Sequence, residues 1–163
     1  MTGRSNSAMT MHASCVAFGD TGILLCGPSG AGKSDIALRL IEAGAVLVAD
    51  DRVLLSAERG DLHAAAPPAL AGLLEIRGIG LVELPCLSSV IVRLVGDIVY
   101  AGPVERLPPP AWSEYLGIRI PQVAVAPFEQ SAVAKLRIAA YDAAGQADPA
   151  TGARRHEKDE PTR

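Results

Sequence analysis

The sequence predicts an α/β fold, a single P-loop-containing domain with a mixed sheet and flanking helices. A short apolar run at 22–26 precedes a glycine-rich loop at 27–34, and apolar residues at helical spacing follow over 34–43. A strand, a glycine loop and a helix in this order direct backbone amides and the positive end of a helix toward an anion. The chain has 163 residues, 49% of them hydrophobic, which suffices for one domain with a core and is too short for two.

The other elements follow from apolar runs and turn residues. Strands are expected at 12–18, 22–26, 45–50 (with 51–56 as its continuation or the next strand), 81–84, 88–95 and 123–126. Helices are expected at 34–43 and 132–144, with a short helical segment at 69–74 and an irregular glycine-rich stretch at 75–80. We expect a flexible N-terminus over 1–11, the P-loop domain over 12–144 and a disordered polar tail over 145–163.

Charge and composition argue against several classes of function. A net charge of −3 gives no general case for nucleic-acid binding. The three cysteines, Cys15, Cys26 and Cys86, are far apart, so buried thiols are favoured over a disulfide or a zinc site. The longest apolar run is interrupted by Arg93 and Asp97, which argues against a membrane span. Since the N-terminus has no apolar signal core, we expect a cytoplasmic protein.

The glycine-rich loop is a complete phosphate-binding motif. It consists of Gly27, Pro28, Ser29, Gly30, Ala31, Gly32, Lys33 and Ser34. Backbone N–H groups of such a loop surround phosphates, the lysine reaches the β and γ oxygens, and the serine hydroxyl ligates Mg²⁺. The proline has no N–H, so this loop offers one amide fewer. The motif predicts binding of a nucleotide or another polyphosphate; a glycine turn without a ligand is the alternative.

Two further groups of polar residues could complete a site. Asp50 and Asp51 follow an apolar strand, at the edge where ligands bind in open α/β sheets. One of them could ligate Mg²⁺ or take a proton from an attacking hydroxyl, and the alternative is a turn with two solvated acids. Glu75 and Arg77, two residues apart, would project to the same side of an extended segment. They suit a metal and a phosphate, or equally a surface ion pair.

Taken together, these stretches resemble the catalytic, C-terminal domain of the bacterial HPr kinase/phosphorylases. The matching residues are His12, 27–34, 48–53, 65–68 and 74–80, and the resemblance covers about 12–141. The loop is generic, but an aspartate pair followed by Glu-Ile-Arg-Gly-x-Gly is specific to this family.

The resemblance assigns a role to each matching residue. Lys33 would hold the transferred phosphate, while Ser34 and Glu75 would ligate Mg²⁺. Asp51 would be the base that activates a serine hydroxyl on HPr, a small phosphocarrier protein. The remaining catalytic residues would be His12, Arg77 and Arg106.

The resemblance implies a Mg²⁺- and ATP-dependent protein-serine kinase that acts on HPr or a related phosphotransferase-system carrier and assembles as a homo-hexamer. We expect a short, single-domain form, because the sequence shows no counterpart of the family's usual N-terminal domain. The segment 127–132, which the family uses for dephosphorylation, carries no lysine or arginine before Lys135, so reverse phosphorolysis should be weak. The alternatives are a nucleotide-gated regulatory module without phosphoryl transfer, and a small-molecule kinase or NTPase.

Overall fold

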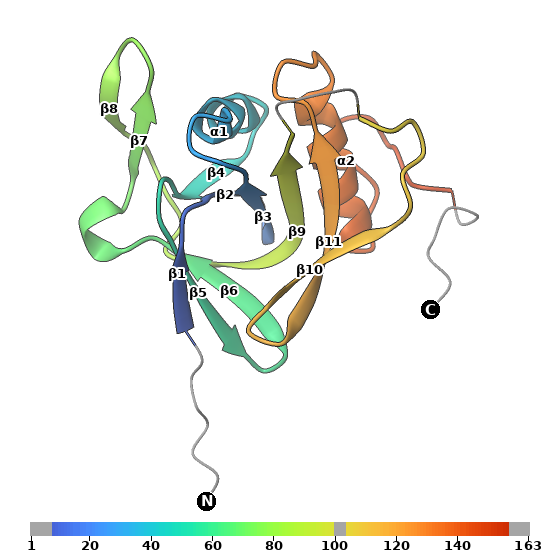
Figure 1. Cartoon of the computed structure of the whole chain (residues 1–163), viewed down its shortest axis with the longest axis horizontal. Coiled ribbons are helices and arrows are strands. Elements are labelled where there is room, and N and C mark those ends of the chain that lie inside the picture. The colour runs from blue at the N-terminus through green and yellow to red at the C-terminus, as the bar shows by residue number, and fades with distance from the viewer. Residues whose placement is uncertain (1–7, 100–103, 157–163) are drawn as a thin grey trace, which may run out of the picture.

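The computed structural model describes residues 8–99 and 104–156 (Figure 1). Its strands are β1 Ala8–Met11, β2 Ser14–Phe18, β3 Thr21–Cys26, β4 Val46–Ala49, β5 Val53–Glu58, β6 Asp61–Ala65, β7 Leu73–Ile76, β8 Gly80–Glu83, β9 Val90–Ile98, β10 Ala111–Tyr115 and β11 Ile118–Val125. The helices are α1 Lys33–Glu42 and α2 Ala132–Ala143, with a 3₁₀ turn at Pro68–Leu70. Within the described parts of the chain, no helix has the length and apolarity needed to cross a membrane.

Nine strands form one mixed sheet around β9. The order is β1-β5-β6-β9-β3-β2-β4, with β11 also paired to β9 and β10 paired to β11. The start of β9 pairs antiparallel with β6, its end pairs parallel with β11, and β3 lies parallel to it throughout. The remaining strands, β7 and β8, form a separate hairpin.

The directions of the strands bring four carboxyl ends to one edge of the sheet. Strands β3, β9 and β11 are parallel neighbours. Strand β4 is antiparallel to β2, which is itself antiparallel to β3, so β4 runs in the same direction as β3. The residues that follow β3, β4, β9 and β11 therefore meet at the edge where ligands bind in α/β sheets.

The sheet buries both of its faces. Helices α1 and α2 cover one face, where Ile36 and Leu40 of α1 and Leu136 of α2 join the core. A second core that includes Val48, Leu55, Leu62, Val92 and Ile120 fills the other face, which the curled sheet encloses by itself (Figure 1). Burial on both faces explains why the strands read as continuous apolar runs with little alternation.

A glycine in β9 sets how closely α2 approaches the sheet. A Cβ atom added at Gly96 would lie 2.8 Å from Leu136 Cδ2 and 3.2 Å from Leu25 Cδ2. Because the first distance is shorter than carbon atoms tolerate and the second is tight, the leucine side chains would have to shift to admit a larger residue.

The α/β class, the mixed sheet and the flanking helices are confirmed. The expected strands 22–26 and 88–95 and the helices 34–43 and 132–144 all form, and β9 continues to Ile98. Two predictions were wrong because residues that form turns were interpreted as the ends of regular secondary structure. The stretch 75–80 forms most of the β7–β8 hairpin, and the helical segment expected at 69–74 is a 3₁₀ turn followed by β7. Strand β10 was not predicted.

The predicted flexible N-terminus and disordered tail are wrong for part of the residues that the structure describes. Residues 8–11 form β1, which pairs antiparallel with β5, although we expected a flexible N-terminus there. The described part of the segment 145–163, for which we expected disorder, is anchored at Asp148. The rest of both segments lies outside the described residues.

Asp148 is fully buried and holds the end of the described chain against α2. Its carboxylate accepts hydrogen bonds from Arg137 Nε (3.1 and 3.2 Å), the Ala150 N–H (3.1 Å) and Thr151 Oγ1 (2.6 Å). Burial acts to raise the pKa of Asp148, but the hydrogen bonds from Thr151, Ala150 and Arg137 outweigh it and hold the pKa below its ordinary value. The carboxylate is thus stabilised in its charged form.

Replacing this carboxylate should destabilise the domain. We expect Asp148→Ala to lower the free energy of unfolding by about 3 kcal/mol at pH 7, because the Arg137 guanidinium would lose its buried partner. Urea denaturation of both proteins measures the difference. Asp142→Ala is the matched control, since the pair of Asp142 with Arg155 at 3.8 Å is partly exposed and should contribute at most about 1 kcal/mol.

The contribution of Asp148 should also depend on pH. A carboxyl whose pKa is lowered on folding stabilises the protein above its unfolded pKa, about 3.9, and this stabilisation is lost as the pH falls through the folded value. The difference between wild type and Asp148→Ala should therefore shrink below about pH 4. An unchanged difference at pH 3 would contradict this account.

Candidate functional site

The glycine-rich loop at 27–34 connects β3 to α1 at the edge where the carboxyl ends meet. Its backbone is folded tightly, with the Ala31 N–H donating to the Pro28 carbonyl at 3.0 Å. Gly30 and Gly32 have φ angles of 82° and 102°, a conformation that glycine adopts without strain. No side chain caps α1, whose N-cap residue is Gly32. The first amides of the helix therefore remain available to an anion.

Lys33 lies across this loop. Its Nζ donates hydrogen bonds to the carbonyls of Gly27 at 2.6 Å and Pro28 at 3.0 Å. A lysine ammonium has three donors, so this geometry leaves one for a phosphate oxygen. The positive charge of the Lys33 ammonium is thus positioned at the loop.

Asp50, the residue after β4, joins the loop to two other segments. The residue is 5% exposed, and its Oδ1 accepts hydrogen bonds from Ser34 Oγ at 2.9 Å and Ser14 Oγ at 2.6 Å. Its Oδ2 lies 3.4 Å from the Glu75 backbone N–H. The aspartate that faces the loop serine is therefore the first of the pair, and burial fixes its position.

Asp51 points in a different direction because the backbone reverses at this residue. The Arg52 N–H donates to the Asp50 carbonyl at 2.7 Å, which makes Asp51 the central residue of a γ-turn, with φ at 67°. Positive φ in a residue other than glycine is strained and is concentrated at functional sites. The Asp51 carboxylate is 67% exposed and lies 3.5 Å from Nδ1 of His12, which is 64% exposed. Both side chains are therefore accessible to a partner that approaches from solvent.

The oxygen atoms around Ser34 suit a magnesium ion. Mg²⁺ prefers oxygen ligands and is commonly held by one or two carboxylates together with substrate phosphates. Ser34 Oγ and Asp50 Oδ1 lie 2.9 Å apart at the end of the loop. No group of three His, Cys, Asp or Glu side chains with metal-binding geometry occurs among residues 8–99 and 104–156. These two oxygens would suit a metal ion whose remaining ligands come from phosphate oxygens and water.

The structure brings some predicted site residues together and leaves others apart. Glu75 lies in β7, where its backbone contacts Asp50 but its side chain is exposed. Arg77 is exposed in the turn of the β7–β8 hairpin. Arg106 is exposed in the segment after β9 and makes no hydrogen bond or ion pair with another described residue. The roles that the resemblance assigns to these three residues remain predictions.

Three residues that touch the site carried no signal in the sequence. Ser14 bonds the buried carboxylate from β2, and Arg39 of α1 contacts the turn that follows β11. Tyr115 contacts the last residue of β3, directly before the loop, with its Oη 3.6 Å from Cys26 Sγ. Burial is the main cause that raises the pKa of Cys26 and the pKa of Tyr115, the latter to about 12, so neither group is a base at neutral pH. The exposed Asp51 is the better candidate for that role.

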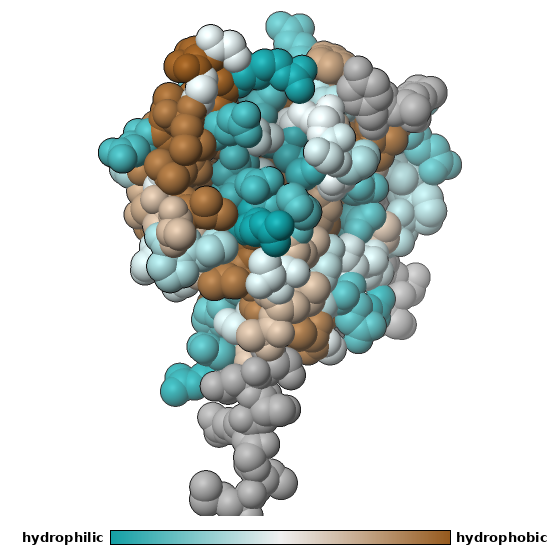
Figure 2. Space-filling model, turned by 60° about the vertical axis from the view of Figure 1, so that its left-hand side comes forward, coloured by the Kyte–Doolittle hydropathy of each residue, from teal (hydrophilic) through white to brown (hydrophobic). Residues whose placement is uncertain are grey.

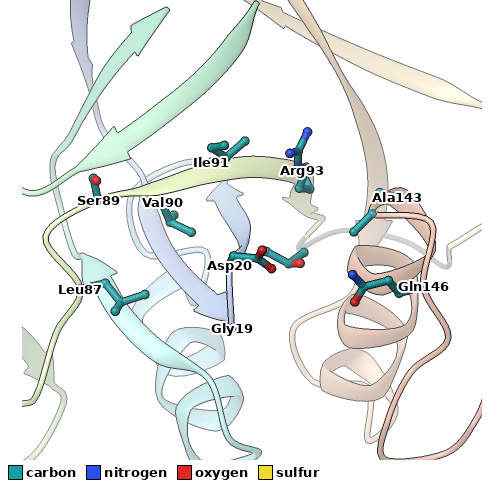
Figure 3. A pocket seen from close by; sticks show the side chains of 11 residues that line it. Gly19, Asp20, Leu87, Ser89, Val90, Ile91, Arg93, Ala143 and Gln146 are labelled. Atoms are coloured by element: carbon teal, nitrogen blue, oxygen red, sulfur yellow. The ribbon is translucent and has the colours of Figure 1, made fainter. Parts of the chain in front are cut away.

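One cavity of the described structure lies away from the loop. It has a volume of about 500 Å³ and lies at the opposite edge of the sheet, at the starts of β3 and β9 (Figure 3). Asp20, Arg93 and Gln146 are among its polar lining residues.

An apolar surface adjoins the site on the β7–β8 hairpin. Ile79 and Leu81 are 76% and 66% exposed. Figure 2 shows a hydrophobic patch next to a hydrophilic one on the face that carries the hairpin. Exposed apolar patches of this kind often contact other proteins.

Comparisons with known proteins agree with this geometry. The sequence model of the HPr Serine kinase C-terminal domain matches residues 5–88. The chain belongs to this family. The match includes the loop, the aspartate pair and the β7–β8 hairpin.

Named relatives and a solved structure support the same family. The chain is 40% identical to an HPr kinase/phosphorylase of Clostridium tetani over 55% of this chain and 31% of that protein. It is 36% identical to an HPr kinase/phosphorylase of Brevibacillus brevis over 67% of this chain and 36% of that protein. The structure of the Hpr(Ser) kinase/phosphatase from Coxiella burnetii superposes with a TM-score of 0.66 and 28% identity, over 72% of this chain and 85% of that one. The matched region thus spans about a third of these curated relatives.

The two neighbouring aspartates should differ sharply in their effect on stability. Asp50→Ala should lower the free energy of unfolding by about 2 kcal/mol, because it leaves the buried Ser14 hydroxyl without an acceptor. Asp51→Asn should change it by less than about 0.5 kcal/mol, because the side chain is exposed and asparagine tolerates positive φ. Urea denaturation measures both values, and equal losses would contradict the assignment.

Proposed function

We propose that this domain is a Mg²⁺- and ATP-dependent protein-serine kinase of the cytoplasm that phosphorylates HPr or a related phosphotransferase-system carrier. One observation carries the proposal. A buried carboxylate bonded to the loop serine, Asp50, is followed directly by an exposed one, Asp51, at the end of the same strand. Family membership and the names of the relatives support HPr as the acceptor. The homo-hexamer that the resemblance implies stays a prediction.

The groups at this edge suit each part of phosphoryl transfer. The loop amides and Lys33 would hold the β and γ phosphates, and Ser34 with Asp50 would hold Mg²⁺, whose charge offsets that of the phosphate oxygens. Asp51 would accept the proton of the acceptor hydroxyl, and His12 at 3.5 Å would orient its carboxylate. The serine oxygen then forms a bond to the γ phosphorus as the bond to the bridging oxygen breaks, and ADP leaves.

The exposure of the acceptor side favours a protein substrate. Pockets for small molecules enclose most of their ligand, whereas Asp51 and His12 lie 67% and 64% exposed at an open edge. A serine on a protein surface can reach such groups directly. The exposed Ile79 and Leu81 on the adjoining hairpin offer apolar area to the same partner.

Removing the proposed base should abolish transfer without preventing binding. We expect Asp51→Asn to slow transfer of the γ-labelled phosphoryl group from ATP to HPr by about 10² to 10⁴-fold, because the amide cannot accept the proton. The dissociation constant for ATP, measured by calorimetry, should stay unchanged. Asp20→Asn, at the opposite edge of the sheet, is the control.

Two results would argue against this function. Loss of both ATP binding and transfer in Asp51→Asn would assign Asp51 a structural role. If wild-type protein binds ATP and HPr but leaves HPr unlabelled, the domain is a binding module and not a kinase.

The reverse reaction should be weak. Phosphorolysis brings inorganic phosphate against a phosphoserine and needs cationic groups, yet the two cations beside the segment 127–132 are engaged. Lys135 Nζ pairs with Glu129 at 2.8 Å, and Arg39 bonds backbone carbonyls. We expect pyrophosphate formation from phosphorylated HPr and inorganic phosphate to be about 10²-fold slower than the forward transfer.

Releasing Lys135 tests this explanation. Glu129→Ala should raise the rate of pyrophosphate formation, whereas Gln130→Ala should leave it unchanged, because the glutamine holds no cation in the described structure. Comparable forward and reverse rates in the wild-type protein would contradict the prediction.

A further inference from the structure

The turn after β11 is held by an arginine of α1. The Glu129 N–H donates to the Ala126 carbonyl at 3.2 Å, which closes a four-residue turn with Pro127 and Phe128 at its centre. Arg39 donates from Nη1 to the Pro127 carbonyl at 2.6 Å and from Nη2 to the Glu129 carbonyl at 3.1 Å. The guanidinium therefore fixes the backbone on both sides of Phe128.

This turn lies next to the phosphate-binding loop. A Cβ atom added at Gly32 would lie 3.4 Å from Pro127 Cβ, in van der Waals contact. Strand β11 ends at the same edge as β3, and the Val99 N–H bonds the Val125 carbonyl at 2.9 Å. Figure 1 shows the turn between β11 and α2 beside α1. The turn borders the last glycine of the loop without entering the loop.

Phe128 is displayed at the tip of this fixed turn. The residue is 79% exposed, the highest value among the large apolar residues that are exposed in the described structure. Pro127, its neighbour in the turn, is buried. An aromatic ring on a rigid backbone beside an anion site presents a flat apolar face to whatever is attached to the anion.

We propose that Phe128 is the stacking platform for the base of the nucleotide whose phosphates occupy the loop. The inference rests on the proposed function, because it requires a nucleotide there, and it adds the part of the site that recognises the base. Ribose and phosphates separate a base from its terminal phosphates, so a bound nucleotide would place its base beside the loop, and the turn is a segment that borders the loop. Stacking depends on the π face that all bases share and so binds ATP and GTP alike.

Arg39 is then a positioning residue. It holds the carbonyls of Pro127 and Glu129 and acts on the nucleotide only through the direction of the Phe128 ring. A lysine at this position has a single donor atom in place of the two nitrogens that contact the two carbonyls, and no planar fork, so it should hold the turn less firmly.

The test compares a ligand with a base and a ligand without one. Calorimetry on the full chain with Mg²⁺ gives dissociation constants for ATP and for inorganic tripolyphosphate. We expect Phe128→Ala to weaken ATP binding by about 10-fold or more and to leave tripolyphosphate binding unchanged. Phe128→Trp should retain the affinity for ATP. Trp112→Ala, which removes an exposed aromatic ring from β10, is the matched control and should change neither constant.

The role of Arg39 has its own test. Arg39→Lys should weaken ATP binding in the same selective manner, and the double variant with Phe128→Ala should be no weaker than Phe128→Ala alone. Additive losses would show that Arg39 contacts the nucleotide independently of Phe128, and would overturn the positioning role.

The failures of the two proposals are distinguishable. If Phe128→Ala weakens ATP and tripolyphosphate equally, the turn shapes the loop and the platform is wrong. If it changes neither constant, the platform is wrong and Phe128 belongs to a contact with the carrier or with a second copy of this chain. If wild-type protein binds neither ligand, the proposed function fails and the platform with it.

Discussion

The carboxylate of Asp50 is the point on which the candidate site depends. It joins β2 through Ser14, the start of α1 through Ser34 and the β7–β8 hairpin through the backbone of Glu75. These segments are distant in the sequence and meet only because β4 runs in the same direction as β3. A buried acceptor with three donors fixes the loop serine relative to the sheet, since any displacement would leave a buried polar group unpaired.

The γ-turn at Asp51 separates two carboxylates that are neighbours in the sequence and for which we propose different roles. An extended backbone would also send the two carboxylates to opposite sides, but onto the two faces of the sheet and not out of the end of the strand. With φ at 67°, Asp51 instead leaves the sheet edge toward His12 while Asp50 stays with the loop. Left-handed backbone in an aspartate costs about 1 kcal/mol or more, and the hydrogen bonds of its buried neighbour hold it in place.

The features predicted well from the sequence are local ones, and those predicted badly depend on distant contacts. Glycine spacing and a helical repeat within one short stretch specify the loop at 27–34 and the helix after it. The β7–β8 hairpin was missed because Gly78 suggested a break, whereas its φ of 89° makes the turn that joins the two strands. The ordered structure around Asp148 depends on its contact with Arg137 of α2, and no local sequence pattern predicts that contact. Which aspartate faces the loop depends on the γ-turn at Asp51. The residue types in that turn do not require a positive φ, so the sequence does not indicate it.

The two halves of the proposed site differ in their access to water. The half that would hold phosphates is anchored by a buried group, Asp50 at 5% exposure, whose hydrogen bond fixes Ser34 in place, although residues 28–30 of the loop are exposed. The half that would receive the acceptor is open, with Asp51 and His12 more than half exposed. Water could therefore compete with a serine hydroxyl at Asp51 unless something covers it. The cavity at the starts of β3 and β9 lies at the opposite edge of the sheet and offers no cover here. The proposed kinase would then depend on its protein substrate to exclude water, which ties phosphoryl transfer to correct docking of the carrier.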